Sequence, residues 1–475
     1  MFKTKKLIYL ALLAIVVSSC KESYPSIEEA LPSNPEDVVP TQGQVDKVPI
    51  MPSLNDPQFT IQTRAQGGSG VFESWETDAK HWLEAIFHVF AYSTPNKFDG
   101  TAADMRETTD HQTDPNLNPG TSTLLFDRIM KITNRQGDVR FHRSENSEDD
   151  AKFYYPINEQ RKKYNFFAYY ADNAKDGQLD CQKDKVTMKV KIDGYQDIMH
   201  SFAYHTNDEF QHWVQEASKT LSGDNLAVIT GGGAENLLYS TLAGHRGLNP
   251  IFHINHLMSK FNIYVQGAGN EESGAGGGDY RNVVVTGVTV ESPTRGTLTV
   301  AADGWTEQRY KQAVANGEVL TWNTEEKTEL HMNIYTDSLQ GKMRSLYNEP
   351  EWRRIGLKTG QAHYNLKDKN SHLLGKPMVL PSVREFTFTL HSVYMNLHKN
   401  EDGSYGFLKD HPLVMQASPY VVALDETKYP NGFEAGKEYS IIIYVYGNQT
   451  ISIRALLQNE WQPVDDPIEV GKDPD

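Results

Sequence analysis

The sequence predicts a mainly β protein that folds as two β-sandwich domains with a few helical inserts. Three observations lead to this prediction. Between Trp82 and Leu457, β-branched and aromatic residues alternate with polar ones in many short runs, and this period of two is typical of strands with one buried face. Gly, Asn, Asp and Pro separate the runs, as they do in turns between short strands. The chain of 475 residues is long enough for two or three domains.

The chain opens with an apolar run, Leu7–Val17, that follows three lysines. Its eleven residues are too few to span a bilayer, so residues 1–19 are expected to be a secretory signal rather than a membrane helix. The small pair Ser18-Ser19 leads into Cys20, which resembles the lipobox of a bacterial lipoprotein signal. The resemblance implies cleavage before Cys20 and its acylation, and two or more acyl chains would form a stable membrane anchor. The alternative is an ordinary signal peptide with an incidental cysteine.

The segment after this signal, Lys21–Asp56, is rich in Pro, Ser, Glu and Asp and has almost no aromatic residues. Such a composition buries too little apolar surface to offset the entropy of ordering, so we expect a stalk or a removable leader. Phe59 and Ile61 then alternate with polar neighbours, which predicts a short strand that ends at Arg64 and a glycine cluster. We therefore assign residues 20–64 to a leader or linker.

Two sandwich domains are expected to follow, the first over residues 65–240 and the second over residues 241–475. Their predicted strands include the runs Trp82–Ser93, Tyr164–Ala171, Lys185–Ile192, Asn282–Glu291, Glu385–Leu397 and Tyr439–Leu457. Helical periodicity is confined to inserts. It is clearest over residues 208–221, where the apolar side chains fall on one helix face, and weaker over residues 305–317 and 338–352.

Charge and cysteine content limit the classes of partner. The formal net charge is −16, from 46 basic and 62 acidic residues, which argues against nucleic acid and against basic adhesion to membranes. The chain has only two cysteines, Cys20 and Cys181. With Cys20 acylated no intramolecular disulfide can form, so hydrophobic cores must stabilise the fold. Cys181 is expected to be a small half-buried residue, with a reactive thiol as the alternative.

No motif in the sequence predicts a catalytic, metal or cofactor site. The glycine-rich residues 229–238 lack the Gly-Lys-Ser/Thr ending of a phosphate loop, and the acidic residues 267–280 are expected to be a hairpin loop. His253 and His256 lie three residues apart in a strand run. They would face opposite sides of the strand, so we expect structural roles rather than a shared metal. The protein is expected to be no enzyme and to need no metal or organic cofactor.

Several stretches, taken in order, resemble the fimbrillin family of Bacteroidales, the subunits of type V pili. "YNFFAYYADNA" resembles the aromatic strand of the family's first domain, and Asp197–Met199 resembles the end of that domain. "FHINHLMSKFNIYV" resembles the strand that opens the second domain, where Leu257, Ser259 and Lys260 match the family motif with an offset of one residue. Residues 432–464 resemble the closing hairpin and tryptophan, and "VPIMPSLNDPQFTIQTRA" resembles the segment before the maturation cut.

The resemblance implies two tandem transthyretin-like sandwiches that reach the cell surface as a lipoprotein. It implies that an arginine-specific protease removes the leader with its first strand, and that an extended segment of another subunit fills the vacated groove, as in donor-strand complementation. Phe59 and Ile61 would then fill the groove and Arg64 would be the cleavage site. An ordinary surface arginine is the alternative for Arg64. The tail Trp461–Asp475 is a candidate donor segment, or it completes the chain's own sheet.

The sequence therefore favours a structural and adhesive subunit of a pilus (fimbrium) at the outer-membrane surface. Its expected partners are other fimbrillin subunits, outer-membrane lipid through acylated Cys20, and host or bacterial surface receptors. The alternative is a surface glycan-binding lipoprotein for nutrient uptake, which an exposed row of tryptophans would indicate. A surface hydrolase has no motif in its favour. Stalk, tip and anchor roles stay open, because they differ in whether Arg64 is cut and in what fills the groove.

Overall fold

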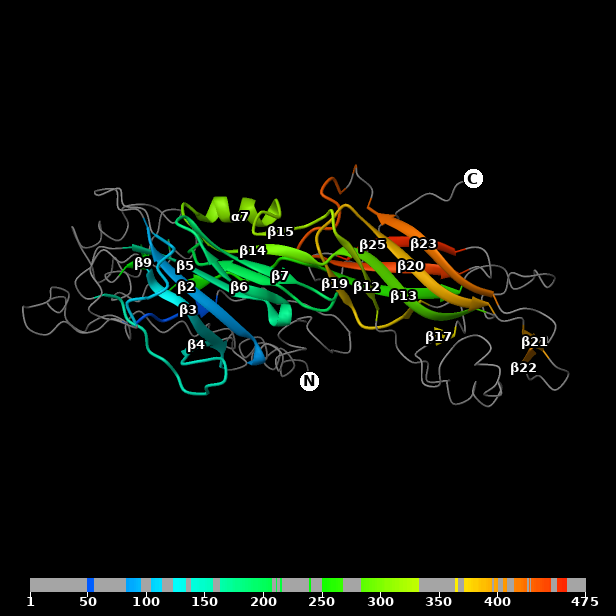
Figure 1. Cartoon of the computed structure of the whole chain (residues 1–475), viewed down its shortest axis with the longest axis horizontal. Coiled ribbons are helices and arrows are strands. Elements are labelled where there is room, and N and C mark those ends of the chain that lie inside the picture. The colour runs from blue at the N-terminus through cyan, green and yellow to red at the C-terminus, as the bar shows by residue number, and fades with distance from the viewer. Residues whose placement is uncertain are drawn as a thin grey trace, which may run out of the picture.

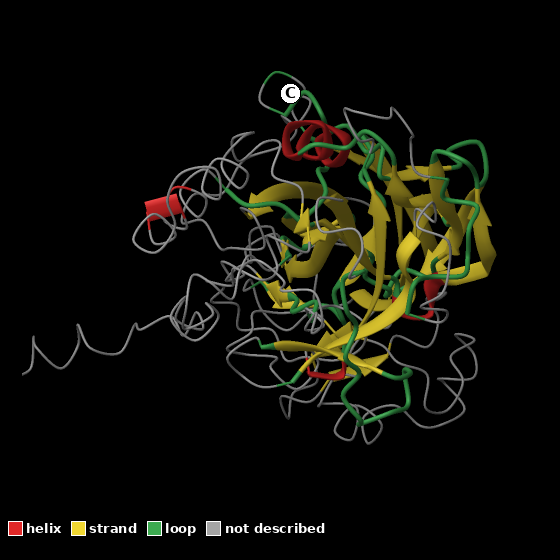
Figure 2. Ribbon diagram, turned by 90° about the vertical axis from the view of Figure 1, so that its left-hand side faces the viewer, coloured by secondary structure: helices red, strands yellow, loops and turns green. Residues whose placement is uncertain are grey.

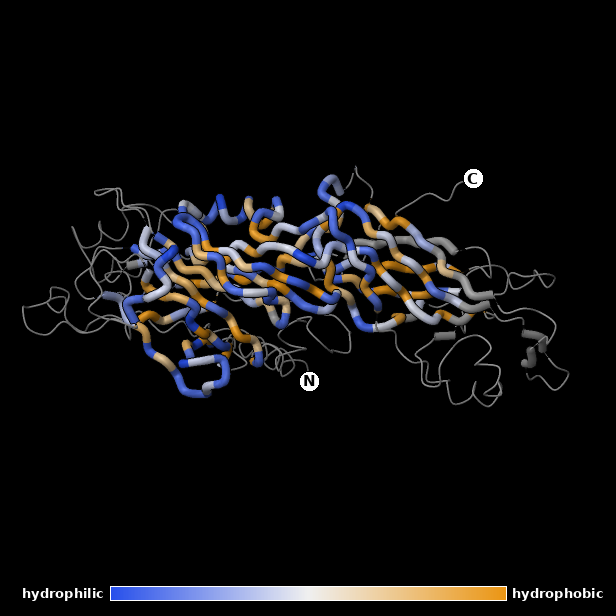
Figure 3. Tube along the Cα trace, viewed as in Figure 1, coloured by the Kyte–Doolittle hydropathy of each residue, from blue (hydrophilic) through white to orange (hydrophobic). Residues whose placement is uncertain are grey.

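The structure, a computed structural model, describes residues 49–54, 83–94, 104–112, 123–133, 138–156, 163–206, 211, 214–215, 239–240, 250–267, 283–332, 364–365, 371–394, 397–399, 405–407, 414–424, 427, 429–445 and 451–458. The fold is mainly β, which confirms the predicted class. Its strands form two sandwiches that lie end to end along the long axis of the molecule (Figure 1). Apolar residues gather along the strands of both sandwiches (Figure 3).

One sheet of the N-terminal sandwich has seven antiparallel strands in the order β11-β8-β5-β2-β3-β4, with β9 pairing with β5. The strands are β2 (Ile86–Ser93), β3 (Thr123–Ile132), β4 (Val139–His142), β5 (Lys163–Tyr170), β8 (Met199–Phe202), β9 (Tyr239–Ser240) and β11 (Asn255–His256). In the central strand β5, of sequence KYNFFAYY, every residue after Lys163 is buried. Successive strand residues are all buried only where both faces of a sheet are covered. This sheet therefore has an apolar layer on each side.

The opposing sheet has four strands in the order β15-β14-β7-β6. They are β6 (Lys175–Cys181), β7 (Lys185–Lys191), β14 (Arg295–Ala302) and β15 (Leu320–Trp322). Strand β7 alternates except at Thr187, since Val186, Met188 and Val190 are buried in the core between the two sheets while Lys185, Lys189 and Lys191 are exposed. Such alternation is typical of a sheet with one face in the core and the other in water.

Helix α7 (Glu307–Ala315) follows β14 and lies outside the strand layers (Figure 2). It begins after Thr306, whose hydroxyl accepts a hydrogen bond from the backbone N–H of Arg309, as an N-cap residue does. Tyr310 of this helix is buried, and its hydroxyl donates to the carbonyl of His200 in β8 at 2.9 Å. The helix thus packs Tyr310 and Ala313 into the core between the two sheets.

The N-terminal sandwich includes strands from beyond residue 240, where the sequence suggested that the first domain ends. Strands β14 and β15 and helix α7 come from beyond that residue, yet β14 pairs with β7 along seven residue pairs. Local alternation predicts that a segment is a strand, but it does not say which strand pairs with it. The helix predicted over residues 305–317 is confirmed as α7. The one over residues 338–352, and most of the one over 208–221, lie outside the described residues.

The C-terminal sandwich packs two five-stranded sheets, of orders β18-β12-β24-β25 and β16-β13-β20-β23, with β19 and β17 pairing beside β12 and β13. Their strands are β12 (Ser259–Gly267), β13 (Val283–Pro293), β16 (Lys327–His331), β17 (Tyr364–Asn365), β18 (His372–Leu373), β19 (Met378–Leu380), β20 (Glu385–Tyr394), β23 (Val414–Ala423), β24 (Glu438–Val445) and β25 (Ile451–Gln458). A separate hairpin, β21 (Leu397–Lys399) with β22 (Tyr405–Phe407), lies at the far end (Figure 1). Strands β12 and β24 pair in parallel, and Phe261 lies in the core between the sheets.

The two sandwiches are joined by strands that pass from one to the other. Only Leu257 and Met258 separate β11 from β12, and only Thr294 separates β13 from β14. Backbone hydrogen bonds close the junction, from Leu257 N to Ile198 O at 2.8 Å and from Ile192 N to Thr294 O at 2.9 Å. We call this junction the seam; it comprises residues 192–198, 255–260, 292–295 and 378–380.

Candidate functional site

Most residues that the sequence singled out lie outside the described residues. These are Cys20, Phe59, Ile61, Arg64 and the tail Trp461–Asp475, so their roles stay predictions. The structure does describe part of the predicted leader, residues 49–54, which includes strand β1 (Ser53–Leu54). The environment of this segment is the best candidate for a functional site.

Residues 49–54 run between two other segments of backbone. On one side Pro49 forms an antiparallel bridge with Tyr154, and Ile50 N donates to Phe153 O at 2.8 Å. On the other side β1 pairs in parallel with β10 (Ile251–Phe252). Ser53 N donates to the carbonyl oxygen of Pro250 at 3.0 Å. We call residues 150–156 the first wall and residues 250–252 the second wall. The segment and the two walls together form the docking layer.

The side chains of the segment alternate as in a strand with one buried face. Ile50 is only 4 % exposed, whereas its neighbour Met51 is 49 % exposed. Leu54, four residues on, packs against the same apolar cluster as Ile50. Burial of one isoleucine side chain is worth about 1.5–3 kcal/mol before entropy losses. Sequence reasoning missed these two residues, and the signal that could have found them is the spacing of Ile50, Pro52 and Leu54 in "VPIMPSL".

The floor of the docking layer is the outer face of the seven-stranded sheet, and it is strongly aromatic. Phe166 of β5 makes an edge-on contact with Tyr239, with ring centroids 5.5 Å apart. Phe153 of the first wall meets Phe141 of β4 in the same way at 5.1 Å. The described members of this cluster include Phe87, Phe141, Phe153, Tyr155, Tyr164, Phe166, Tyr170, Tyr239 and Phe252. The burial of β5 on both faces is therefore explained by the docking layer on one side and the four-stranded sheet on the other.

The second wall leads directly into the seam. Tyr204 N donates to Ile251 O at 3.2 Å, and Phe252 bridges Ala203 next to β8. The next residue, His253, stacks on Tyr204 with ring centroids 3.9 Å apart, and its Nε2 lies 2.9 Å from the Tyr204 carbonyl oxygen.

The other candidate histidine, His256, places its Nδ1 2.7 Å from Asp197 Oδ2. His253 and His256 thus contact different partners within the fold, which agrees with the structural roles expected for them. Across the described residues, no group of three His, Cys, Asp or Glu side chains is placed to hold a metal ion.

Cys181 lies at the end of β6 and packs against the core between the two N-terminal sheets. Burial raises the pKa of its thiol, and the charges of Asp180 and Asp127 raise this pKa further. A thiol with a raised pKa forms less of the nucleophilic thiolate. The structure thus supports a small, half-buried residue rather than a reactive one. Among the helices within the described ranges, none has the length and apolar character to cross a membrane.

A mainly β rod of two sandwiches, with an N-terminal segment docked as a strand on one of them, is the class of protein that the fold and the site define. Comparison with protein-family models finds no match. Comparison with curated proteins finds none either.

Solved structures give matches over most of the chain. A fimbrial protein from Bacteroides vulgatus is 13% identical with a TM-score of 0.44, covering 87% of this chain and 99% of that one. A proposed cell adhesion protein from Bacteroides uniformis is 10% identical with a TM-score of 0.38, covering 88% of this chain and 99% of that one. The fimbrial anchor protein Mfa2 from Porphyromonas gingivalis is 10% identical with a TM-score of 0.26, covering 80% and 92%.

Proposed function

We propose that this chain is a structural and adhesive subunit of a cell-surface pilus, with no enzymatic activity. It is exported as a lipoprotein, anchored in the outer membrane through acylated Cys20, and assembled by strand exchange after proteolysis at Arg64. The observation that carries the proposal is the docked segment 49–54, which precedes Arg64 in the chain and lies as a strand between the two walls. Its partners are other subunits of the same kind, and it adheres to receptors on host or bacterial surfaces.

The way in which the segment is held supports the proposal of strand exchange. While it is covalently attached, its effective concentration at the groove is high, and it outcompetes a strand that arrives from solution. Cleavage at Arg64 removes this advantage. Loss of the segment would leave backbone groups of both walls unpaired above an aromatic floor, which is a site where another chain adds a strand.

The incoming strand that we propose is the C-terminal tail of a second copy. Pro467-Ile468-Glu469-Val470 begins with the same Pro-Ile pair as Pro49-Ile50-Met51-Pro52 and has an apolar residue two positions further on. Ile468 would then occupy the site of Ile50. Phe59 and Ile61 remain predicted groove residues of the uncut leader.

The test uses an arginine-specific protease on the full-length protein. Treated native protein should start at Ala65 and form ladders on unboiled gels, while Arg64→Ala should stay monomeric. Arg309→Ala is the matched control, since the Arg309 side chain lies on α7, outside the docking layer, and is 46% exposed; this variant should form ladders as the native protein does. Ile468→Ser should be cut normally but form few ladders. Ladders from Arg64→Ala equal to those of the native protein would contradict the proposal.

The glycan-binding alternative gains no support from the described residues. It would be favoured by a row of exposed tryptophans on one face. Trp305 is instead buried in the core of the N-terminal sandwich, with its ring centroid 5.8 Å from that of Phe167. Trp322 is half-buried against the same core.

A further inference from the structure

The first wall is held by a polar arm, residues 104–112, as well as by the docked segment. Asp110 of this arm is 1% exposed, and its carboxylate accepts hydrogen bonds from Phe126 N at 2.9 Å and from Arg128 at 2.8 Å (Nε) and 2.6 Å (Nη2). A buried carboxylate with a two-pronged arginine partner is a rigid attachment. It fixes the arm to strand β3.

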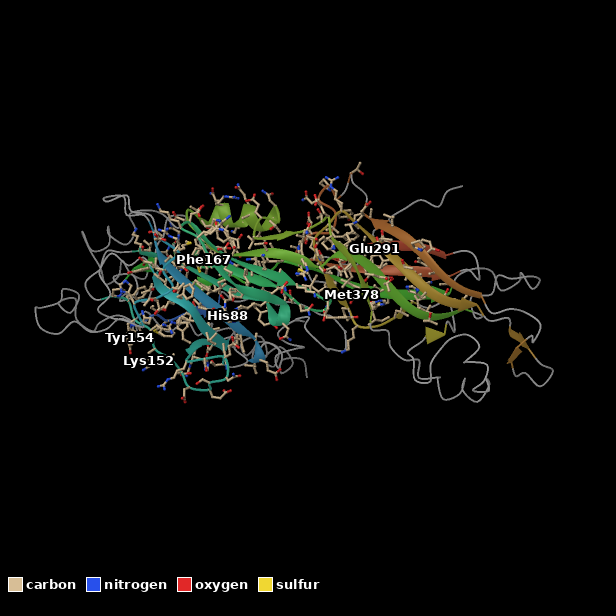
Figure 4. All side chains as sticks on the ribbon, viewed as in Figure 1. His88, Lys152, Tyr154, Phe167, Glu291 and Met378 are labelled. Carbon is tan, nitrogen blue, oxygen red and sulfur yellow. The ribbon has the colours of Figure 1, made fainter. Side chains whose placement is uncertain are left out.

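Two contacts reach the first wall from this attachment, one from Arg128 of β3 and one from Gln112 of the arm. The Arg128 guanidinium lies over the ring of Phe153, 5.1 Å from the ring centroid. The backbone N–H of Gln112 also donates to Asp110, and the side-chain amide of Gln112 forms hydrogen bonds with the backbone of Tyr154. Tyr154 lies on the side of the sandwich opposite α7 (Figure 4).

The contact between Gln112 and Tyr154 replaces a neighbouring strand. The Gln112 Oε1 accepts from Tyr154 N at 2.9 Å, and its Nε2 donates to Tyr154 O at 2.7 Å. Successive residues of a strand point their backbone groups to opposite sides. Phe153 accordingly turns its carbonyl toward Ile50 of the docked segment, while Tyr154 turns both of its groups toward Gln112. One edge of the wall is thus bonded to the segment and the other edge to a side chain of the fold.

We propose that Gln112 is a positioning residue, which holds the first wall in strand geometry so that the docking layer keeps its shape when segment 49–54 leaves. Ala151 N of the first wall also donates to Phe141 O of β4 at 2.8 Å. After the segment leaves, the wall is therefore still held at Ala151 by β4 and at Tyr154 by Gln112. An incoming strand meets a preformed edge rather than a loop that it must order. The role in strand entry rests on the proposed function, but the role in holding the wall concerns the uncut chain alone.

The experiment is hydrogen exchange of the full-length, uncut protein, read at single amides by mass spectrometry. Gln112→Met keeps the length of the side chain and removes both hydrogen bonds to Tyr154. The exchange of the Ile50 amide should become about tenfold faster, since one net hydrogen bond of about 1.4 kcal/mol corresponds to a factor of ten. The Leu257 amide, which donates to Ile198 O in the seam, should exchange at the native rate.

Two further variants make the result decisive. Gln178→Met changes an exposed glutamine of β6 and should leave the Ile50 amide at its native rate. Arg128→Lys keeps the charge but loses the two-pronged geometry on Asp110, so it should accelerate Ile50 less than Gln112→Met does. The proposal is overturned if Ile50 exchange is unchanged in Gln112→Met, or if Leu257 accelerates by the same factor, which would mean general destabilisation. Neither result depends on cleavage at Arg64, so failure of the proposed assembly is seen separately.

Discussion

The docking layer and the seam are both built from short backbone pairings, but they hold the chain in opposite ways. At the seam, β11 continues into β12 after two residues and β13 into β14 after one. The two sandwiches therefore cannot separate unless strands are pulled from their sheets. In the docking layer, the described contacts of segment 49–54 are non-covalent, and the amides of Ile50 and Ser53 donate to the walls. Continuity of the strands holds the seam, whereas short backbone pairings and apolar burial hold segment 49–54.

The two regions also differ in the chemistry of their contacts, which are partly charged at the seam and apolar in the docking layer. The seam encloses charged groups: Asp197 is fully buried beside His256, and Lys260 Nζ lies 3.6 Å from Glu438 Oε1, with both side chains buried. Separating a buried pair leaves an uncompensated charge, which costs several kcal/mol. The docking layer instead places apolar side chains on an aromatic floor. Hydrophobic contacts of this kind have little directional preference, which suits the strand exchange proposed above.

The largest expected effect comes from the seam. Met258 is fully buried at the point where β11 passes into β12, so Met258→Ala should lower the free energy of unfolding by about 2–5 kcal/mol. Because the strands on both sides are continuous, both sandwiches should lose stability together in one denaturant transition. Met51→Ala is the matched control, since Met51 is 49% exposed, and it should change stability by less than about 0.5 kcal/mol. Two separate transitions, with only one of them shifted, would show that the seam does not couple the sandwiches.

An intermediate effect is expected from acid. His200 lies on β8, which pairs with β11 of the seam and is followed directly by Ala203, the residue that bridges Phe252 of the second wall. Burial lowers the pKa of His200 to about 4, and the hydrogen bond that its Nε2–H donates to Val300 O at 2.9 Å offsets this only in part. Above the unfolded value of 6.5 the ring is neutral in both states. As the pH falls from 6.5 to 4, the unfolded chain binds the proton first, so stability is lost, by about 3 kcal/mol in total.

The measurement is the free energy of unfolding at several pH values in that window. His200→Gln can still hydrogen-bond but does not titrate, so its stability should fall less steeply than that of the native protein between pH 6.5 and 4. Equal slopes for the two proteins would mean that His200 is protonated in the folded state. The difference between slopes isolates His200 from the carboxylates, which titrate in both proteins.

The comparison also shows what the sequence could predict. Strands β2 and β7 lie within the predicted runs Trp82–Ser93 and Lys185–Ile192, and β5 begins one residue before the predicted run Tyr164–Ala171, because alternation is a local property. The pairing of β7 with β14 depends on residues far apart in the chain, and no local pattern contains it. The docked segment was missed for another reason. With Pro49 and Pro52 among six residues, it is too short and too poor in strand-forming residues for the spacing of Ile50, Pro52 and Leu54 to predict a strand on its own.

The smallest expected effect on global stability, and the sharpest test of the comparison, comes from Ile50→Ala. The substitution removes about 2 kcal/mol of apolar burial from the docked segment. At the seam a loss of this size would appear in full in global unfolding. In the docking layer, we expect the segment to detach while both sandwiches stay folded, so the global loss of stability cannot exceed the free energy of docking itself.

We therefore expect the Ser53 amide, which donates to the second wall, to exchange about 30-fold faster in Ile50→Ala. The loss in the global free energy of unfolding should be below about 1 kcal/mol, and the exchange of the Leu257 amide should not change. Met51→Ala, one residue away and exposed, should leave all three quantities at their native values. If Ile50→Ala instead lowered global stability by the full amount and accelerated Leu257 as well, the segment would be an integral strand of the fold, and its exchange for another strand would require the sandwich to unfold.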